Sequence, residues 1–450
     1  MSLACLALAG CATVPVVSES HRAHPKAQVQ ISGSRGPLSA RQSKAVLSRL
    51  AAQAPNAGAL ERHLAIEQAV AESPLFTGNR VTILRDGTET FPAMFAAIQG
   101  AQRSIELEYY IFEDVSCNGQ SLSDLLVAKR KAGVAINVIY DGIGSVSTPD
   151  DFLTRLKDAG VQLVQFNPPN PLKWRRHFSL NDRDHRKMLI ADGTLAIVGG
   201  VNLSSTYQSA PGSAGSDETT PHEFWRDTDL QIAGPVVTEL QKLFLQHWQQ
   251  QSGPPLGNPA TAPPGPQGDE VVRIIGSAPS KLTARYYATV LSAIQNAESA
   301  VWMTAGYFVP THQEKEDLIR AARRGVDVQL LLPSHSDSSP ALAVQRSHYS
   351  DLLEAGVKVY ERDASILHSK TLTVDGAWSV VGSSNFDARS VLFNDEVDAV
   401  VVGRETAAQL QRIFQEDLEH AHPIDLARWK RRPVAAKLRE HFWRVWEKLL

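Results

Sequence analysis

The sequence predicts an α/β protein made of two related lobes that share one active site, and three observations support this fold class. A motif containing His, Lys, Asp, Gly and Asn occurs twice in the 450 residues, at a constant offset of 183. Shorter segments around the two motifs recur in the same order. Within each copy, stretches of helical periodicity alternate with short apolar runs of strand length. Two lobes that each supply half of a site are expected to lie as a pseudo-twofold pair.

The repeated motif is the strongest of these observations. Its residues are His185, Lys187, Asp192, Gly199 and Asn202 in the first copy, and His368, Lys370, Asp375, Gly382 and Asn385 in the second. From residue frequencies alone, one H-x-K-x4-D string arises in roughly one chain in thirty of this size, and a matched pair with the same Gly and Asn is far rarer. Two half-sites built alike indicate one composite active site, and therefore an enzyme.

Segments outside the motifs also repeat. Residues 97–101 recur at 293–297, and the Ala-Gly-Val of 159–161 recurs at 355–357. Both pairs lie 196 residues apart, so the two copies differ from each other by small insertions. Alternating strands and helices predict sheets that are covered by helices on both faces. The predicted helices are 122–131, 152–158 and 318–323, and the predicted strands are 104–112, 135–140, 300–309 and 327–332.

Each motif is predicted to form a hairpin. From His185 onward the residues alternate as in a strand, which places His185 and Lys187 on the same face. Asp192-Gly193 then supplies a tight turn, and 195–198 returns as the second strand. The second copy follows the same pattern, with the strands 368–374 and 378–381 around Asp375-Gly376.

Composition and local patterns give the domain organisation. The stretch 252–267 is rich in Pro, Gly, Ala and Asn, which is typical of a linker. We expect a lipoprotein signal and tether at 1–40, a helical extension at 41–74, a first lobe at 75–250, a linker at 251–269, a second lobe at 270–420 and a basic amphipathic segment at 421–450.

Both ends of the chain suggest contact with a membrane. Leu-Ala-Gly-Cys11 is similar to a bacterial lipobox, although no Lys or Arg precedes it; the alternative is a frayed apolar terminus. Residues 426–450 hold eight Lys and Arg against two Glu, together with Trp429, Trp443 and Trp446. Such a helix either lies in the bilayer interface or docks its Trp face on the protein. No apolar run reaches the length of an ordinary spanning helix, so a peripheral or lipid-anchored bacterial membrane protein is expected.

Charge and cysteine content exclude other classes. The net charge of −3 provides no basic field, so nucleic acid is not an expected partner. The three cysteines have no Cys/His ligand spacing, and neither a metal nor a cofactor is predicted.

The two half-sites suit phosphodiester chemistry. One neutral imidazole attacks phosphorus and the other, protonated, donates to the leaving oxygen. The two lysines and two asparagines would hold the phosphoryl oxygens. Asp227 and Glu396, which follow the motifs, would orient the imidazoles and favour their cations. Asp192 and Asp375 are placed in the catalytic set, with a structural role at the hairpin turns as the alternative.

Several neighbouring residues allow two interpretations. Arg183, Arg186 and the segment 173–177 either attract an anionic headgroup or belong to a solvated loop. Tyr109, Tyr110, Tyr307 and Phe308 are expected to be core residues, with a platform for the substrate as the alternative. His247 is expected to be an ordinary histidine.

The motifs resemble those of a known family. HxKxxxxD followed by GGxN or GSxN, present twice, is similar to the phospholipase D superfamily, and residues 181–187, 306–310 and 382–390 resemble bacterial cardiolipin synthases. The resemblance implies two α/β/α sandwich lobes with a shared site, His185 as nucleophile and His368 as acid. Gly306 stands where that family often has Pro, and the two N-terminal spanning helices of many members are not found here.

Three functions follow from the resemblance and the motifs. The first is a phosphatidyltransferase that makes cardiolipin from phosphatidylglycerol, with phosphatidylethanolamine as a second candidate substrate. The second is a phospholipase D-type hydrolase in which water resolves the same intermediate, acting on phospholipid or, as the less favoured substrate, on nucleic acid. The third is a lipid-binding scaffold, which the two complete motifs disfavour. The requirement for a protein partner is left open.

Overall fold

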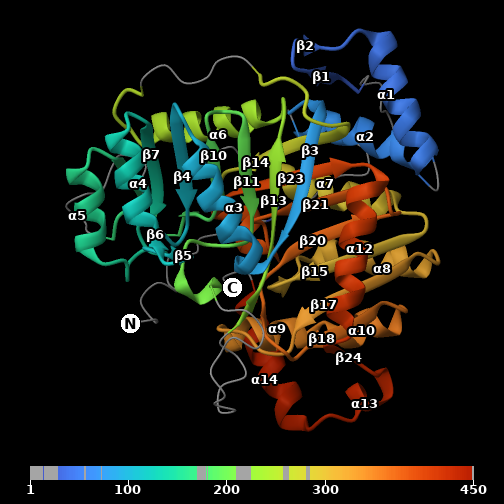
Figure 1. The fold of residues 1–450 in the computed structure, drawn as a ribbon. Coiled ribbons are helices and arrows are strands. Elements are labelled where there is room, and N and C mark those ends of the chain that lie inside the picture. Colours follow the sequence, from blue (N-terminus) through green and yellow to red (C-terminus); the bar gives the residue numbers. More distant parts are fainter. Residues whose placement is uncertain are drawn as a thin grey trace.

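The protein folds into two lobes that lie side by side, the first blue to green and the second yellow to red in Figure 1. The structure is a computed structural model. It describes residues 14, 29–54, 57–71, 73–169, 179, 181–208, 224–256, 263–279 and 284–447. Cys11 and the cationic segment 173–177 lie outside the described residues.

In the described residues, the first lobe contains a seven-stranded sheet with the order β8-β7-β4-β10-β11-β13-β3. β4, β7 and β8 are parallel and the other pairs are antiparallel. The strands are β3 (Leu75–Arg85), β4 (Ser104–Tyr109), β7 (Ala135–Asp141), β8 (Gln162–Phe166), β10 (Lys187–Ala191), β11 (Leu195–Gly199) and β13 (Thr228–Ala233). The helices are α3 (Asp86–Gly100), α4 (Leu122–Lys131), α5 (Asp150–Asp158) and α6 (Val237–Gln250).

The second lobe has the same strand order, β18-β17-β15-β20-β21-β23-β14, with the same parallel and antiparallel pairs. Its strands are β14 (Glu270–Ser277), β15 (Ala300–Ala305), β17 (Asp327–Pro333), β18 (Lys358–Arg362), β20 (Lys370–Val374), β21 (Trp378–Gly382) and β23 (Asn394–Val402). Its helices are α7 (Arg285–Asn296), α8 (His312–Arg323), α9 (Ser339–Ser347), α10 (Tyr349–Glu354), α11 (Ala388–Leu392) and α12 (Arg404–Leu418).

Helices cover both faces of each sheet. In the first lobe, α3, α4 and α5 pack in one core and α6 packs on the other face, where its core continues into β14 and β23 of the second lobe. In the second lobe, α7, α8 and α10 pack on one face and Phe414 of α12 on the other. The predicted α/β fold of two α/β/α lobes is confirmed.

Local sequence explains the ends of the elements. Ser121 accepts a hydrogen bond from the amide of Asp124 and starts α4, which ends in three cations. Thr311 and Glu314 form a capping box at α8. The hairpin turns have positive φ at Asp192 (54°) and Asp375 (51°), followed in each case by a glycine.

The lobes are joined at two kinds of contact. β3 pairs with β14 and so links the two sheets. Two short parallel pairs cross between the lobes: β9 (Arg183–Asp184) with the start of β23, and β12 (Trp225–Arg226) with β19 (Ile366–Leu367). β9 and β19 end one residue before His185 and His368, so each motif histidine is held at the boundary between the lobes.

The hairpin prediction needs one correction. The strands begin at Lys187 and Lys370, so both histidines stand just before a strand instead of inside it. The reason is that the backbone amide of His185 donates to Asp395 and that of His368 donates to Arg226, both in the other lobe. These backbone hydrogen bonds to the other lobe replace the hydrogen bonds to a neighbouring strand that a continuous strand would require.

The ends of the chain add small elements. β1 (Ile31–Gly33), β2 (Gly36–Pro37), α1 (Ala40–Gln53) and α2 (Ala57–Ala71) precede the first lobe, and β24 (Ala421–Pro423), α13 (Leu426–Lys430) and α14 (Val434–Arg444) follow the second. Between α6 and β14, the described residues 251–256 and 263–269 form no helix or strand.

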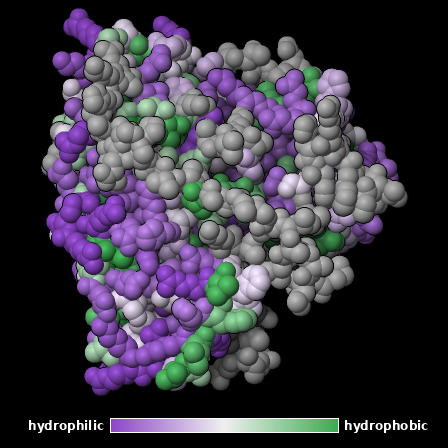
Figure 2. Space-filling model, turned by 180° about the vertical axis from the view of Figure 1, so that it is seen from behind, coloured by the Kyte–Doolittle hydropathy of each residue, from purple (hydrophilic) through white to green (hydrophobic). Residues whose placement is uncertain are grey.

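α14 lies at the lower edge of Figure 1, and apolar atoms gather at the lower edge of the molecule in Figure 2. None of the described helices combines the length and the apolar character that crossing a membrane requires.

Candidate active site

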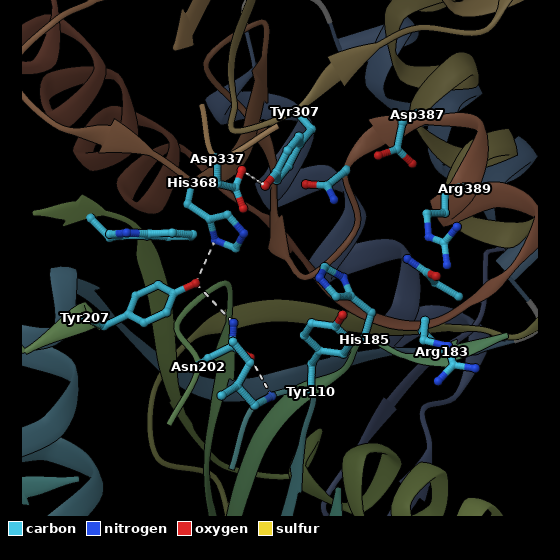
Figure 3. A pocket seen from close by; sticks show the side chains of 14 residues that line it. Tyr110, Arg183, His185, Asn202, Tyr207, Tyr307, Asp337, His368, Asp387 and Arg389 are labelled. Carbon is cyan, nitrogen blue, oxygen red and sulfur yellow. Dashed lines mark hydrogen bonds between the residues drawn. The ribbon is translucent and has the colours of Figure 1, made fainter. Parts of the chain in front are cut away.

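A pocket opens where the two lobes meet, with a volume of about 250 Å³. Figure 3 shows that both motif histidines point into it. The pocket combines imidazoles, amides, guanidinium groups and aromatic rings from both lobes. Its lining residues are Tyr110, Ile111, Arg183, His185, Asn202, Tyr207, Trp225, Tyr307, Asp337, His368, Asn385, Asp387, Arg389 and Asn394.

His185 is held by a carboxylate of the second lobe. Its Nδ1 lies 3.1 Å from both carboxylate oxygens of Glu396, which is fully buried. Burial alone would raise the pKa of Glu396, but the adjacent imidazole, Lys187 and Ser383 bring it below the usual value. Burial is the main reason that the pKa of His185 is lowered, and Glu396 opposes this shift. With Nδ1 on the carboxylate, Nε2 is the nitrogen left for a ligand.

His368 is held in the same way by the first lobe. Its Nδ1 lies 2.6 Å from Oδ2 of Asp227 and 3.2 Å from the hydroxyl of Tyr207. Burial raises the pKa of Asp227 to about 6, so this carboxyl is largely ionised at neutral pH. Burial, followed by the charges of Lys370 and Lys187, holds the pKa of His368 well below its usual value.

The two carboxylates occupy equivalent positions. Asp227 stands two residues before Asp229, which pairs with Gly199, and Glu396 stands two residues before Asp398, which pairs with Gly382. Each imidazole therefore receives its carboxylate from the opposite lobe. The contacts at Nδ1 support the expected orienting role of Asp227 and Glu396. The sequence did not predict that each carboxylate comes from the other lobe.

The motif lysines stand beside the histidines and not on the wall of the pocket. Lys187 donates through Nζ to the carbonyl of His185 at 2.6 Å, and Nζ of Lys370 lies 2.8 Å from Nδ1 of His368. Burial lowers the pKa of Lys187 to about 7 and that of Lys370 to about 8. Near neutral pH their charge thus depends on pH and on any anion bound nearby.

Both motif asparagines line the pocket. Asn202 accepts from the amide of Ile111 and donates to the hydroxyl of Tyr207 at 3.1 Å. Among the described residues, Oδ1 of Asn385 is buried and has no hydrogen-bond partner. A buried amide oxygen of this kind is expected to receive a donor from a ligand.

The motif aspartates are placed elsewhere, which corrects their inclusion in the catalytic set. Asp192 follows the five residues of β10, so it lies roughly 16 Å along the strand from Lys187. Its carboxylate accepts from the amides of Gln102, Arg103 and Ser104 at 2.7–3.0 Å. Asp375 does the same for residues 298–300. Both carboxylates therefore tie a hairpin turn to the start of the neighbouring strand.

This position predicts an effect on stability and not on turnover. Asp192→Ala leaves three amides without their acceptor and puts alanine at positive φ, so we expect a loss of about 1–3 kcal/mol in the free energy of unfolding. The kcat of the folded enzyme should not change. Asp192→Asn keeps one acceptor oxygen and tolerates positive φ, so its loss should be smaller. Urea unfolding and steady-state kinetics on the same samples test this, and a collapse of kcat at unchanged stability would restore the catalytic assignment.

The motif glycines leave room for two buried carboxylates, which the sequence analysis did not identify. A Cβ on Gly199 would lie 2.1 Å from Oδ1 of Asp229, and one on Gly382 would lie 2.1 Å from Oδ1 of Asp398. Burial raises the pKa of each of these aspartates to about 8. They bind the backbone amides of Val201 and Ser384, so they position the turns that carry the asparagines.

Other residues at the site were missed or misjudged. Tyr110 and Tyr307 line the pocket, although a core position was expected, whereas Tyr109 and Phe308 are core residues as expected. Arg183 lines the pocket, so the solvated-loop interpretation fails for it. The repeat itself could have pointed to Tyr207 as a site residue. It lies five residues after Asn202, and Ser390 lies five residues after Asn385 in the second copy. Ser390 donates to Glu396 at 3.0 Å.

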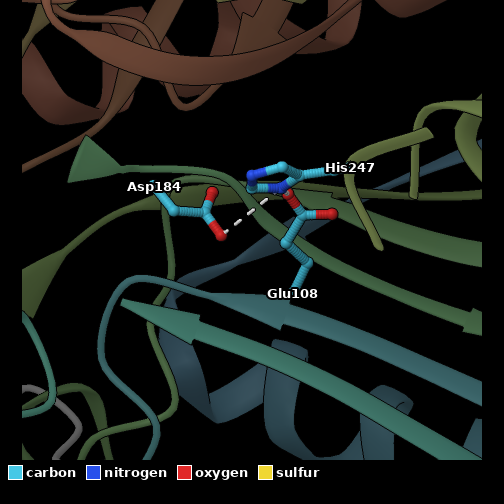
Figure 4. Close-up of side chains that lie close together, drawn as sticks. All are labelled: Glu108, Asp184 and His247. Atoms are coloured by element: carbon cyan, nitrogen blue, oxygen red, sulfur yellow. Dashed lines mark hydrogen bonds and ion pairs between the residues drawn. The ribbon is translucent and has the colours of Figure 1, made fainter. Parts of the chain in front are cut away.

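Beneath the site lies a buried charged cluster, shown in Figure 4. Glu108 accepts from His247 at 2.7 Å and from Arg186 at 3.0 Å, and Asp184 lies close by. Among the described residues, Glu108, Asp184 and His247 are the group whose ligand atoms are close enough for a metal ion. The Arg186 cation already occupies Glu108 and also pairs with Asp395 of the second lobe. We interpret the cluster as an ionic link between the lobes beneath His185, in which His247 is a buried structural histidine.

Comparison with known proteins identifies the family. The family described as "Cardiolipin synthase, PLD-like domain" matches residues 94–211 and 290–418. The cardiolipin synthase of Alkalihalophilus pseudofirmus is 34% identical over 84% of this chain and 74% of its own length. This chain belongs to the cardiolipin synthase family. Cardiolipin synthase A of Pseudomonas syringae is also 34% identical, over 78% of this chain and 71% of its own.

Solved structures support the fold of this family member. A phosphatidylserine synthase from Haemophilus influenzae superposes on 85% of the chain and 99% of its own length, with a TM-score of 0.63 at 12% identity. A polyphosphate kinase from Porphyromonas gingivalis covers 82% of the chain, and 54% of its own length, with a TM-score of 0.52 at 14% identity. The family match and the curated relatives confirm the resemblance to the phospholipase D superfamily, and with it the prediction that the protein is an enzyme.

Proposed function

We propose that this enzyme is a phosphatidyltransferase that makes cardiolipin and glycerol from two molecules of phosphatidylglycerol. The observation that carries the proposal is the crossed pair of imidazoles. Both line the same pocket, and each is held at Nδ1 by a carboxylate of the opposite lobe. Two nitrogen centres in one pocket fit a reaction in two displacement steps. The relatives that match along most of the chain are named cardiolipin synthases.

In the first step, Nε2 of His185 attacks the phosphorus of the donor lipid. The P–O bond to the headgroup glycerol breaks as the P–N bond forms, and His368 gives the proton from its Nε2 to the leaving oxygen. In the second step, His368 takes the proton from a hydroxyl of the acceptor phosphatidylglycerol. The freed oxygen attacks phosphorus, the P–N bond breaks and cardiolipin leaves.

The other residues stabilise the charges of these steps. Lys187 and Lys370 supply positive charge near the phosphoryl group, and Asn202 and Asn385 can bind its oxygens. Ionised Asp227 stabilises the imidazolium that His368 forms each time it holds the proton. The pocket volume of about 250 Å³ accommodates a headgroup and leaves the acyl chains outside. Acyl chains that remain outside the pocket can stay in the bilayer. This is consistent with a protein that works at a membrane surface, bound peripherally or through a lipidated Cys11.

A direct test is to incubate purified protein with phosphatidylglycerol vesicles and separate the lipid products by mass. Cardiolipin with an equal amount of glycerol, absent from His185→Ala, supports the proposal. Phosphatidic acid with glycerol would instead identify water as the acceptor and the protein as a hydrolase. Adding phosphatidylethanolamine tests the second donor, since its use releases ethanolamine.

The lowered pKa values predict a pH profile. Nucleophilic His185 must be neutral, so activity falls as pH drops below its pKa; acidic His368 must be protonated, so activity falls as pH rises above its pKa. Both pKa values lie below the usual value in the free enzyme, and the lysines lose charge through pH 7 to 8. We therefore expect kcat/KM to peak below about pH 6.5 and to fall steadily from there to pH 8. Rates with a soluble short-chain phosphatidylglycerol give this profile, and a maximum above pH 8 would contradict it.

A further inference from the structure

Helix α14 is attached to the second lobe by its inner face. Trp443 packs against Val309, Ala341 and Val344, and the buried Glu440 accepts from Arg432 at 3.0 Å. Trp429, just before α14, packs with its ring 5.0 Å from that of Tyr349. The idea that these tryptophans face a bilayer is therefore wrong, because they are used to dock the segment on the protein.

The opposite face of α14 carries an exposed apolar stripe. Val434, Leu438, Phe442 and Val445 follow at intervals of four, four and three residues, which places them on one side of the helix. They are 69%, 65%, 60% and 76% exposed. The only other large hydrophobic side chains exposed in the described part of the chain are Ile143 and Val146. Such a concentration of apolar surface is typical of an interaction site.

Cations flank this stripe on both sides. At 100° per residue, Lys437, His441 and Arg444 lie along one edge of the stripe and Arg439 along the other. A hollow of about 260 Å³ beside the helix is lined by Lys430, Arg432, Lys437, His441 and Arg444, with Ser347, Ser350 and Glu440. Part of this charge is compensated, since Lys430 pairs with Glu354 and Arg432 with Glu440. An apolar stripe between cations is the pattern of a helix lying in an anionic bilayer interface.

Both apolar sites are linked by contacts to residues that line the active-site pocket. Tyr307 lines the pocket and packs in the same small core as Trp443 of α14. On the first lobe, Ser145 lies between the exposed Ile143 and Val146 and donates to the carbonyl of Tyr110, which also lines the pocket. One lobe thus brings a loop, and the other a helix, next to the lining of a single pocket.

We propose that this docking surface, formed by α14 and the 143–146 loop, binds an anionic phospholipid bilayer and turns the pocket toward it. The apolar side chains lie below the headgroups, and Lys437, Arg439 and Arg444 lie at the level of the phosphates. The hollow beside α14 receives the phosphate of a lipid in the same bilayer. The inference deepens the proposed function, and its test separates docking from catalysis.

Binding is measured by sedimentation with vesicles of equal parts phosphatidylcholine and phosphatidylglycerol, using full-length protein that also carries His185→Ala so that no lipid is consumed. The apolar variant is Leu438→Gln with Phe442→Gln, and the charge variant is Lys437→Gln with Arg439→Gln. The matched control is Lys131→Gln with Lys157→Gln, which lie at the C-terminal ends of α4 and α5, where β7 and β8 begin, opposite to the pocket. All six side chains are exposed, and thermal unfolding checks that each variant is folded.

We expect the apolar and the charge variants to bind anionic vesicles at least about tenfold more weakly than the parent, and the control to bind like the parent. With His185 restored, both variants should lose activity on vesicles and keep it on soluble short-chain phosphatidylglycerol. Equal binding by all variants, or equal parent binding to pure phosphatidylcholine vesicles, would overturn the docking surface. A parent that binds as expected but converts no lipid would instead overturn the proposed function and leave the docking surface in place.

Discussion

Replacing either His185 or His368 with alanine is expected to lower kcat by at least about 10³-fold, because each step of the proposed reaction requires both imidazoles. Without His185 no P–N bond can form, and without His368 the leaving oxygen departs as an alkoxide. The measurement is the initial rate of cardiolipin formation in vesicles. His312→Ala, at an exposed position at the start of α8, is the control and should retain the full rate.

A substrate with an acidic leaving group separates the two roles. A nitrophenyl phosphodiester needs no proton on its leaving group, so His368→Ala should still release nitrophenolate once and accumulate phosphohistidine at position 185. His185→Ala should form no covalent intermediate with the same substrate. Phosphohistidine at position 368 in the His185→Ala enzyme would reverse the assigned order, and a near-normal rate in either single variant would reject the composite site.

Asp227→Asn and Glu396→Gln are expected to lower kcat by roughly 10²–10⁴-fold, because each carboxylate sets the tautomer of its imidazole and stabilises the cation. Glu396→Gln can donate to Nδ1 of His185 and so favours a proton on Nε2, the atom that must attack. Asp227→Asn removes the negative charge beside Nδ1 of His368, so the imidazolium is harder to form. Both variants keep nearly the same volume in a buried position, which limits the effect on packing.

The crossing of the carboxylates gives this prediction a second readout. Removing an adjacent anion destabilises the imidazolium, so Asp227→Asn should lower the pKa of His368 while leaving that of His185 nearly unchanged. Glu396→Gln should lower the pKa of His185 and leave that of His368 nearly unchanged. Titration of isotope-labelled histidines by NMR measures both values, with the exposed pair Asp363 and His422 as a control through Asp363→Asn. If Asp227→Asn moved the pKa of His185 instead, the crossed arrangement would be wrong.

Much of the fold could be predicted because local rules act over short distances. The helix α4 has the bounds expected from its periodicity, since Ser121 and the terminal cations mark its ends. The turns at Asp192 and Asp375 follow from residues that tolerate positive φ. The position of His185 outside the strand could not be predicted, because its amide bonds to a residue 210 positions away.

The sequence by itself determined the number of lobes, the content of each half-site and the family. These are encoded by repetition and by neighbours along the chain. Only the tertiary structure decided that each imidazole takes its carboxylate from the other lobe, across 141 and 211 residues. It also decided that Asp192 serves a turn, and that α14 turns Trp443 inward and Phe442 outward. The physical reason is that a side chain's role depends on what the other lobe or a packed helix places beside it, and sequence spacing does not contain that information.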